Sequence, residues 1–139
     1  MNLKHIAKNY HFCQQIISKT CFDLEIIFNL IISKKIQFIY LVGPYGSGKT
    51  DFTKKFARKI GIKHKIISPS FNFMFAYENL VHIDLDNFSS KLDEFQDYFE
   101  QNYVVIEWAN KLDELSQNSI LINFEIIDPD SRKIKFCWN

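Results

Sequence analysis

The alternation of hydrophobic and polar positions divides the first half of the chain into a helical region, a strand and a helix. Apolar residues recur at helical spacing in residues 1–35, which predicts that this region is mostly helical. Residues 36–42 form an apolar run rich in β-branched and aromatic residues, typical of a buried strand. Apolar positions spaced by four within residues 50–60 predict an amphipathic helix that ends before Gly61.

In the second half of the chain the pattern is mostly that of strands. The predicted elements are a short strand over 63–67, an antiparallel hairpin of 71–77 and 81–85 around Glu78, a helix from Ser89 or Ser90 to about 101, a buried strand over 103–108, and two last strands over 120–127 and 133–138 joined by the turn 128–131. Strands that alternate with helices in this way are typical of an α/β domain. We therefore predict a mainly parallel sheet with flanking helices and antiparallel hairpins at its margins.

Composition and charge indicate one folded domain and narrow its partners. With 139 residues, of which 47% are hydrophobic, residues 1–139 can bury the core of a single domain. Lys and Arg number 17 against 16 Asp and Glu, so the net charge is +1. This balance argues against an extended nucleic-acid surface and against a DNA partner, although a local basic patch remains possible.

The cysteines and the apolar segments concern the cellular compartment. Cys13, Cys21 and Cys137 are odd in number and scattered, without metal-ligand spacing, so they favour a reducing compartment and a role as small core residues. The longest apolar stretch, residues 24–32, is interrupted by polar residues and is too short to span a bilayer. We expect a cytoplasmic protein that has no membrane partner.

Residues 43–50, Gly-Pro-Tyr-Gly-Ser-Gly-Lys-Thr, match the phosphate-binding loop pattern G-x-x-x-x-G-K-[ST] at every fixed position. Glycines lack Cβ, so backbone N–H groups can turn toward a phosphate of bound ATP. Lys49 would add a positive charge to the β- and γ-phosphates, and the Thr50 hydroxyl would bind Mg²⁺. Because a predicted strand precedes the loop and a predicted helix follows it, a glycine-rich surface turn is the weaker interpretation. The nucleotide-binding residues predicted here are Gly43, Tyr45, Gly46, Ser47, Gly48, Lys49, Thr50 and Asp51.

Two acids are candidates to complete the site, because a phosphate-binding loop needs a carboxylate for Mg²⁺ or its water. Glu107 lies near the end of the predicted strand 103–108, and an ordinary exposed strand-end acid is the alternative interpretation. Asp84 shares a face with His82 by alternation, and a solvated hairpin acid is the alternative there. His82 is interpreted as a hydrogen-bonded structural residue. Trp108 is interpreted either as a core residue or as an exposed interface residue.

Four segments in this order resemble the TsaE (YjeE) family, the bacterial P-loop ATPases needed to make threonylcarbamoyladenosine in tRNA. They are the loop 43–50, Ser-Pro-Ser-Phe at 68–71, His-Ile-Asp-Leu-Asp-Asn at 82–87 and Ile-Glu-Trp at 106–108. The resemblance implies that Lys49 contacts the phosphates, that Thr50 and Glu107 hold Mg²⁺, and that Asp84 is an essential acid of hydrolysis. The predicted catalytic residues are therefore Lys49, Asp84 and Glu107.

The resemblance also implies roles for residues outside the loop. Ser68 and Ser70 would respond to the γ-phosphate, Trp108 would contact a partner, and Arg132 would lie near the nucleotide. The implied activity is that of a weak Mg²⁺-dependent ATPase that resets the TsaD–TsaB complex between turnovers, while tRNA is contacted mainly by those partners. Where the family has tyrosine and arginine, this chain has Asp86 and Asn87.

Two other functions fit a phosphate-binding loop. A small-molecule P-loop kinase would normally close an arginine-bearing lid over the phosphates, but no arginine lies between Arg58 and Arg132. A nucleotide-gated binding module would share the site and have negligible turnover. The replacement of the family arginine by Asn87 keeps this second alternative open.

Overall fold

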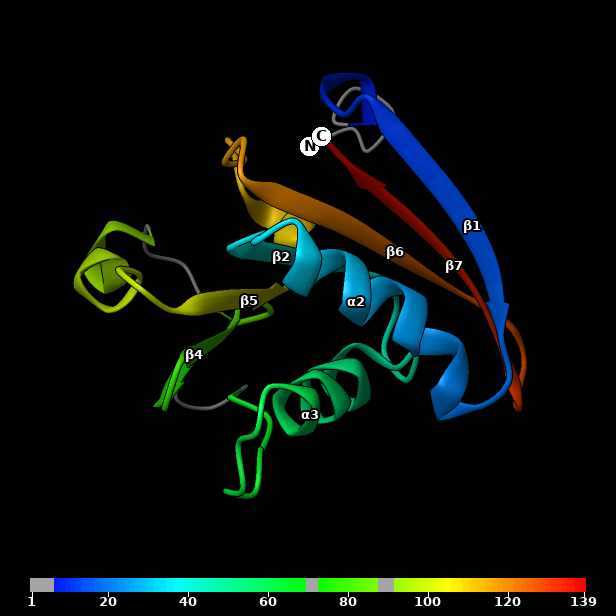
Figure 1. Ribbon diagram of the computed structural model, residues 1–139, viewed down its shortest axis with the longest axis horizontal. Helices are drawn as coiled ribbons and strands as arrows, with labels where there is room; N and C mark the ends of the chain where they lie inside the picture. Colours follow the sequence, from blue (N-terminus) through cyan, green and yellow to red (C-terminus); the bar gives the residue numbers. More distant parts are fainter. Residues whose placement is uncertain (1–6, 70–72, 88–91) are drawn as a thin grey trace.

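The computed structural model describes residues 7–69, 73–87 and 92–139 (Figure 1). Its strands are β1 (Phe12–Ser18), β2 (Phe38–Val42), β3 (Met74–Tyr77), β4 (Leu80–Asp84), β5 (Tyr103–Glu107), β6 (Ser119–Asp128) and β7 (Ser131–Trp138). Its α-helices are α2 (Glu25–Ser33) and α3 (Lys49–Lys59). Short 3-10 helices are η1 (Ala7–Asn9), η2 (Cys21–Leu24), η3 (Leu92–Tyr98) and η4 (Ala109–Lys111).

The strands form one seven-stranded sheet in the order β1-β7-β6-β2-β5-β4-β3. The β6–β2, β2–β5 and β5–β4 pairs are parallel, whereas the β1–β7, β7–β6 and β4–β3 pairs are antiparallel. The prediction of a mainly parallel sheet is therefore wrong, because the sheet is mixed. Its parallel centre and the hairpins at both margins are as predicted. The difference arises from the amino-terminal region, which adds β1 as a further antiparallel strand.

The first residues of the chain form a strand where a helix was predicted. β1 pairs along its whole length with β7, at the opposite end of the sequence. Phe12 and Ile16 are four residues apart, a spacing that fits one face of a helix and equally one face of a strand. In the strand, Phe12 stacks on Trp138 and Ile16 packs against the core beneath the helices. Only the distant partner strand decides between the two periods.

Cys13 and Cys137 correct the prediction that the cysteines are separate core residues. The two are directly opposite in the β1–β7 register and are joined by a disulfide across 124 positions of sequence. Cys137 is buried, whereas Cys13 is exposed on the edge strand. Scattered spacing along the chain carries no signal of this bond, because the antiparallel register brings the two residues together.

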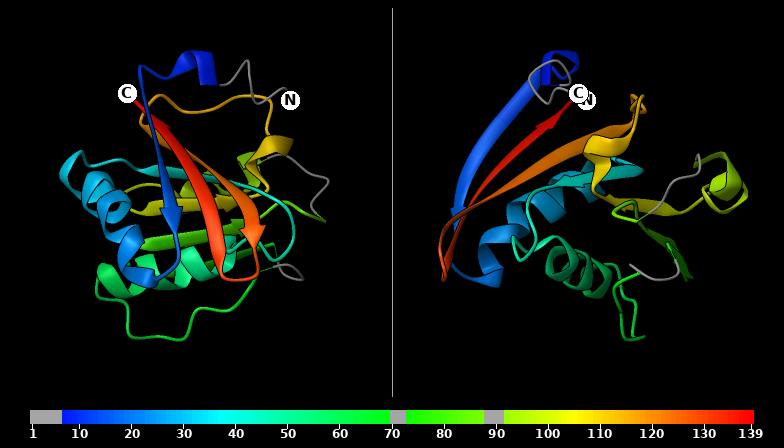
Figure 2. Two further views of the ribbon diagram at one scale, coloured as in Figure 1. Left: turned by 90° about the vertical axis from the view of Figure 1, so that its right-hand side faces the viewer. Right: turned by 180° about the vertical axis from the view of Figure 1, so that it is seen from behind.

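Helices α2 and α3 lie side by side on one face of the sheet (Figures 1 and 2). Phe28 of α2 packs its ring against Phe52 and Phe56 of α3, and these rings are almost fully buried. A second buried cluster covers the other face beneath η3 and η4, with Tyr10 at its margin. The central strands β2, β5 and β6 are thus covered on both faces, which explains their nearly continuous apolar sequences.

Two further predicted elements differ from the structure. Residues 63–67 do not form a strand, since β3 occupies the edge of β4 and leaves no sheet position for them. The predicted helix ending near 101 is the shorter 3-10 helix Leu92–Tyr98, and its proposed start at Ser89 or Ser90 lies outside the described residues. None of the helices in the described part of the chain is long and apolar enough to cross a membrane.

Candidate functional site

The parallel strands end at one edge of the sheet, and the phosphate-binding loop begins there. β2 leads into residues 43–48, and α3 begins at Lys49. In the parallel registers, Leu41 of β2 is opposite Glu107 of β5, and Glu107 is opposite Asp84 of β4. The predicted neighbourhood of the two strands is confirmed, because the carboxyl ends of adjacent parallel strands meet at the same edge.

Two glycines of the loop are needed for different physical reasons. A Cβ on Gly43 would lie 2.7 Å from Ser47 Oγ and 2.8 Å from the backbone oxygen of Phe124, so no larger residue fits. Gly48, immediately before α3, has φ of +106°, in a region that L-residues with side chains rarely adopt. The loop can therefore turn sharply into the amino terminus of α3, where free N–H groups and the helix dipole favour an anion.

Lys49 lies across the mouth of the loop. Its Nζ donates to the backbone oxygens of Gly43 at 2.7 Å and Pro44 at 2.9 Å, and lies 4.4 Å from the ring centre of Trp108. Burial lowers the pKa of this ammonium group, and the nearby carboxylate of Glu107 acts in the opposite direction. A partly desolvated lysine placed here attracts phosphate oxygens more strongly than one in water.

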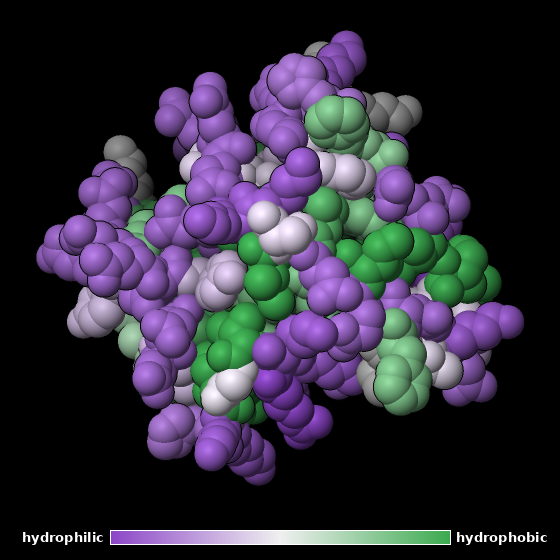
Figure 3. All heavy atoms as spheres, in the orientation of Figure 1, coloured by the Kyte–Doolittle hydropathy of each residue, from purple (hydrophilic) through white to green (hydrophobic). Residues whose placement is uncertain are grey.

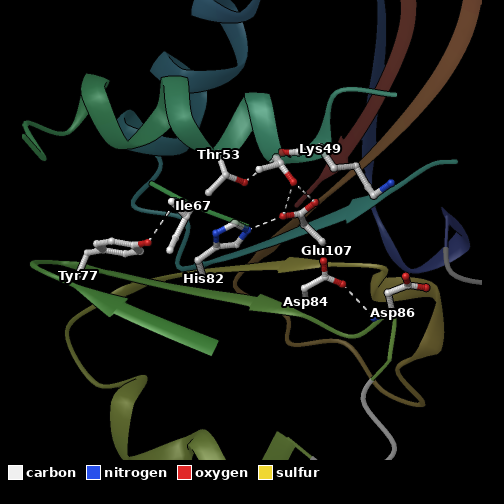
Figure 4. Close-up of polar contacts among 9 residues, drawn as sticks. Lys49, Thr53, Ile67, Tyr77, His82, Asp84, Asp86 and Glu107 are labelled. Carbon is white, nitrogen blue, oxygen red and sulfur yellow. Dashed lines mark hydrogen bonds and ion pairs between the residues drawn. The ribbon is translucent and has the colours of Figure 1, made fainter. Parts of the chain in front are cut away.

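Glu107 is the centre of a buried polar network that joins three elements (Figure 4). The hydroxyl of Thr50, in the first turn of α3, donates to Glu107 Oε1 at 2.9 Å and contacts Oε2 at 3.1 Å. His82 of β4 lies 2.5 Å from Oε2 through Nε2. The side chains of both His82 and Glu107 are almost completely buried. Glu107 is thus a positioned acid and not an exposed strand-end residue.

The contact between His82 and Glu107 was not foreseen from the sequence. His82 was expected to be a hydrogen-bonded structural residue, and the structure confirms that it is hydrogen-bonded. Alternation placed it on one face with Asp84, but the partner on β5 follows only from the parallel register. Within residues 7–69, 73–87 and 92–139, the other ring nitrogen, Nδ1, has no hydrogen-bond partner.

Asp84 lies beside Glu107 at the end of β4, and it is also buried. Its Oδ1 accepts a hydrogen bond from the backbone N–H of Asp86 at 2.9 Å (Figure 4). The side chain of Asp86 contacts the Tyr45 hydroxyl, and its backbone oxygen contacts Lys111. The segment after β4 is therefore tied to the tip of the phosphate-binding loop.

A cleft of about 310 Å³ collects most of the predicted site residues. Its lining residues are Tyr45, Gly46, Ser47, Gly48, Lys49, Thr50, Asp51, Ser68, Asp84, Glu107 and Trp108. Trp108 is half-buried, and its ring packs against that of Tyr45 with centres 4.9 Å apart. The exposed Asp51 carboxylate pairs with Lys55 at 2.6 Å. Ser70, the second predicted switch serine, lies outside the described residues.

Arg132 is not among the residues that line the cleft. From the start of β7 it reaches the phosphate-binding loop, where Nε donates to the backbone oxygen of Ser47 at 3.2 Å and Nη2 to that of Gly46 at 3.1 Å. Nη1 donates to the backbone oxygens of Asp128 and Ser131, within its own hairpin. Its guanidinium group therefore holds loop carbonyls, close to the position predicted for a nucleotide.

The residues of the cleft fit ATP and Mg²⁺. Thr50, Glu107 and Asp84 present hard oxygen atoms, which Mg²⁺ prefers. Among the residues that the structure describes, no group of three or more His, Cys, Asp or Glu side chains could hold a metal by itself. A P-loop Mg²⁺ site matches this set, because phosphate oxygens and water supply most of its ligands. Ser47 Oγ, in the loop, is buried and has no hydrogen-bond partner within the described residues.

Comparison with known proteins gives one consistent family. Residues 10–134 match the model of the family TsaE, described as threonylcarbamoyl adenosine biosynthesis protein TsaE. The chain is 33% identical over 112 residues to the tRNA threonylcarbamoyladenosine biosynthesis protein TsaE of Bacillus subtilis, covering 75% of this chain and 71% of that protein. The corresponding protein of Treponema pallidum is 31% identical over 106 residues, covering 69% and 78%. A crystal structure of Bacillus subtilis YdiB superposes with a TM-score of 0.63 at 28% identity, covering 91% of this chain and 86% of that chain.

Proposed function

The chain belongs to the TsaE family of proteins involved in tRNA threonylcarbamoyladenosine biosynthesis, and we propose that within this process it acts as a cytoplasmic Mg²⁺-dependent ATPase. The observation that carries the proposal is the contact between Thr50 and Glu107. It places a hydroxyl and a carboxylate next to Lys49, at the amino terminus of the helix that follows the loop. Those are the groups needed to bind the phosphates and the metal of Mg·ATP.

Each residue of the cleft has a distinct role in this proposal. The loop amides and Lys49 bind the phosphates, while Thr50 and Glu107 would hold Mg²⁺, which neutralises charge on the transferred phosphoryl group. Asp84, beside Glu107, orients the attacking water. His82 holds the Glu107 carboxylate in place from the buried side, since its Nε2 contacts Oε2.

The chain offers few cations to stabilise the charge of the γ-phosphate. Its two arginines are Arg58 and Arg132. Arg132 is engaged with loop carbonyls, and Arg58 is exposed on α3 and does not line the cleft. We therefore propose that hydrolysis is slow in isolation and that a TsaD–TsaB complex improves it, with Trp108 and the neighbouring Ser68 near the contact. An arginine supplied by a partner is worth about 10³–10⁵ in rate.

A nucleotide-gated binding module is the second candidate function. It is favoured by the contact of Tyr45 with Asp86, because this contact joins the loop tip to the segment that bears the Asp86 and Asn87 replacements. Such a module would bind ATP with similar affinity and would hardly hydrolyse it.

Steady-state ATP turnover in Mg²⁺ and in EDTA tests the proposed activity directly. We expect measurable phosphate release in Mg²⁺, its loss in EDTA, and its loss in Glu107→Gln with ATP binding retained. Lys55→Ala, which changes an exposed α3 lysine paired with Asp51, is the matched control and should hydrolyse ATP normally. Tight ATP binding without any Mg²⁺-dependent turnover, with and without TsaD–TsaB, would favour the binding module instead.

A further inference from the structure

A groove of about 530 Å³ lies between α3 and the segment that follows it, and basic side chains dominate its lining. The lining residues are Lys54, Ala57, Arg58, Ile62, Lys63, His64, Lys65 and Ile66. None of them is acidic. Hydrophilic side chains gather at the lower edge of the molecule, over α3 and the segment after it (Figure 3). The groove is distinct from the nucleotide cleft, which it shares no residue with.

The positive charges of this groove are not neutralised within the described part of the chain. Its four Lys and Arg side chains are exposed and form no ion pair there. The two other lysines of α3 differ, because Lys55 pairs with Asp51 at 2.6 Å and Lys59 with Glu25 at 2.7 Å. Four unpaired positive charges exceed the net charge of +1 for the whole chain, so the rest of the molecule is net negative.

The groove has a firm frame. Ile62 and Ile66 are buried and anchor both ends of the exposed tripeptide 63–65. The backbone N–H of Ile62 donates to the oxygen of Ala57 at 2.9 Å, which holds the segment against the end of α3. On the helix, Lys54 and Arg58 are one turn apart, so their Cα atoms are separated by about 6 Å along the axis. The charges therefore form two neighbouring rows along a shallow channel.

We propose that this groove binds the phosphodiester backbone of RNA, and that the tRNA substrate of the modification machinery is its ligand. The choice of RNA rests on the proposed function, in which the chain works on tRNA, whereas the preference for a polyanion rests on the groove itself. Lys and Arg side chains contact phosphates without reading base sequence. No aromatic residue lines the groove, so it offers no stacking surface for bases.

The position of the groove gives the contact a consequence for the nucleotide cleft. Lys65 is three residues before Ser68, which lines that cleft. RNA held by the tripeptide 63–65 therefore contacts the same segment that reaches the bound nucleotide. The footprint of about four phosphates is small, which agrees with a machinery in which partner proteins provide most of the tRNA contacts.

Fluorescence anisotropy with an unmodified tRNA transcript tests the proposal at several salt concentrations. Four phosphate contacts predict that log K falls with log salt at a slope of about −3. In Lys63→Ala/Lys65→Ala the slope should fall to about half, with binding weaker on the order of tenfold near 0.1 M salt. The matched control is Lys34→Ala/Lys135→Ala, which removes two exposed lysines outside the groove and should bind like the unchanged chain.

Three results would overturn the proposal. They are no tRNA binding at low salt, equal binding by the groove variant and the unchanged chain, and preferential binding of polyaspartate with the same dependence on Lys63 and Lys65. The last result would assign the groove to an acidic protein segment. ATP binding by calorimetry, measured on the same variants, separates the two proposals: failure to bind ATP would count against the ATPase function alone and leave a tRNA result standing.

Discussion

Lys49 illustrates how strongly a single side chain depends on its surroundings in this fold. Its Nζ is held by two loop carbonyls and lies over the Trp108 ring, while Glu107 and Asp84 face it from the sheet edge. Burial lowers the pKa of the amine, and the carboxylates favour its charged form. A charge poised in this way is ready to exchange loop carbonyls for phosphate oxygens.

Replacing Lys49 by alanine should therefore weaken ATP binding by tenfold or more, because a charge-assisted hydrogen bond is worth about 1.5–3 kcal/mol. Titration calorimetry measures the effect. Lys55→Ala, with its exposed ion pair to Asp51, should leave the affinity unchanged. Equal affinity in Lys49→Ala and the unchanged chain would show that the loop does not bind phosphates through this residue.

Glu107 is expected to act on turnover and not on nucleotide affinity. The change Glu107→Gln keeps the shape of the side chain and the contact with Thr50, but it removes the negative charge. Hydrolysis should fall about a hundredfold or more, as expected for loss of a positioned acid or base. Single-turnover phosphate release gives the rate, and calorimetry gives the affinity. A variant with full turnover would remove Glu107 from the proposed metal site.

At the scale of elements, the β6–β7 hairpin supports the phosphate-binding loop from outside. Arg132, at the start of β7, donates to the backbone oxygens of Gly46 and Ser47, while Nη1 is held within the hairpin. When those carbonyls are held outward, the N–H groups of the loop are free to face the cleft. The hairpin is thus connected to nucleotide binding although Arg132 does not line the cleft.

We predict that Arg132→Lys weakens ATP and ADP binding to the same extent, by about fivefold, since one ammonium group cannot replace a fork that reaches two carbonyls. Calorimetry with both nucleotides measures the effect, and hydrogen exchange of residues 46–48 should become faster. A loss for ATP that greatly exceeds the loss for ADP would instead identify Arg132 as a direct ligand of the γ-phosphate.

Elements whose signal is local were predictable from the sequence. The strand before the loop, helix α3 with Gly61 after it, β5 and both hairpins all follow from short-range periodicity and turn residues. The strand β1 did not follow, because the spacing of Phe12 and Ile16 fits a helix as well as a strand. The disulfide and the His82–Glu107 contact depend on which strands become neighbours, and no local pattern carries that information.

At the scale of the whole molecule, the sheet separates two buried clusters, and the nucleotide cleft lies at the edge where its parallel strands end. Tyr40, in the central strand β2, belongs to the cluster on the face opposite the helices. Its hydroxyl accepts a hydrogen bond from the backbone N–H of Ser116 at 2.9 Å. Burial raises the pKa of this phenol to about 12.

This pKa predicts that Tyr40 makes the fold sensitive to alkali. Because the folded pKa is higher than the unfolded value near 10, the contribution of the neutral phenol is complete below pH 10 and is lost as pH rises toward 12. At pH 11 the loss amounts to about 1.4 kcal/mol. Urea unfolding at pH 8 and pH 11 should show that Tyr40→Phe loses less stability than the unchanged chain over this interval. An equal loss in both would contradict the assignment.

The central claim is that this chain is an ATPase whose turnover depends on its partners in tRNA threonylcarbamoyladenosine biosynthesis. Single-turnover hydrolysis of ATP by this chain, alone and mixed with a TsaD–TsaB complex, tests the claim most directly. Glu107→Gln mixed with the same complex controls for hydrolysis by the partners themselves. We predict slow hydrolysis alone and an increase of at least a hundredfold in the complex, within the range that a supplied arginine can give, about 10³–10⁵ at most. Equal rates with and without TsaD–TsaB, or an increase that persists in Glu107→Gln, would contradict it.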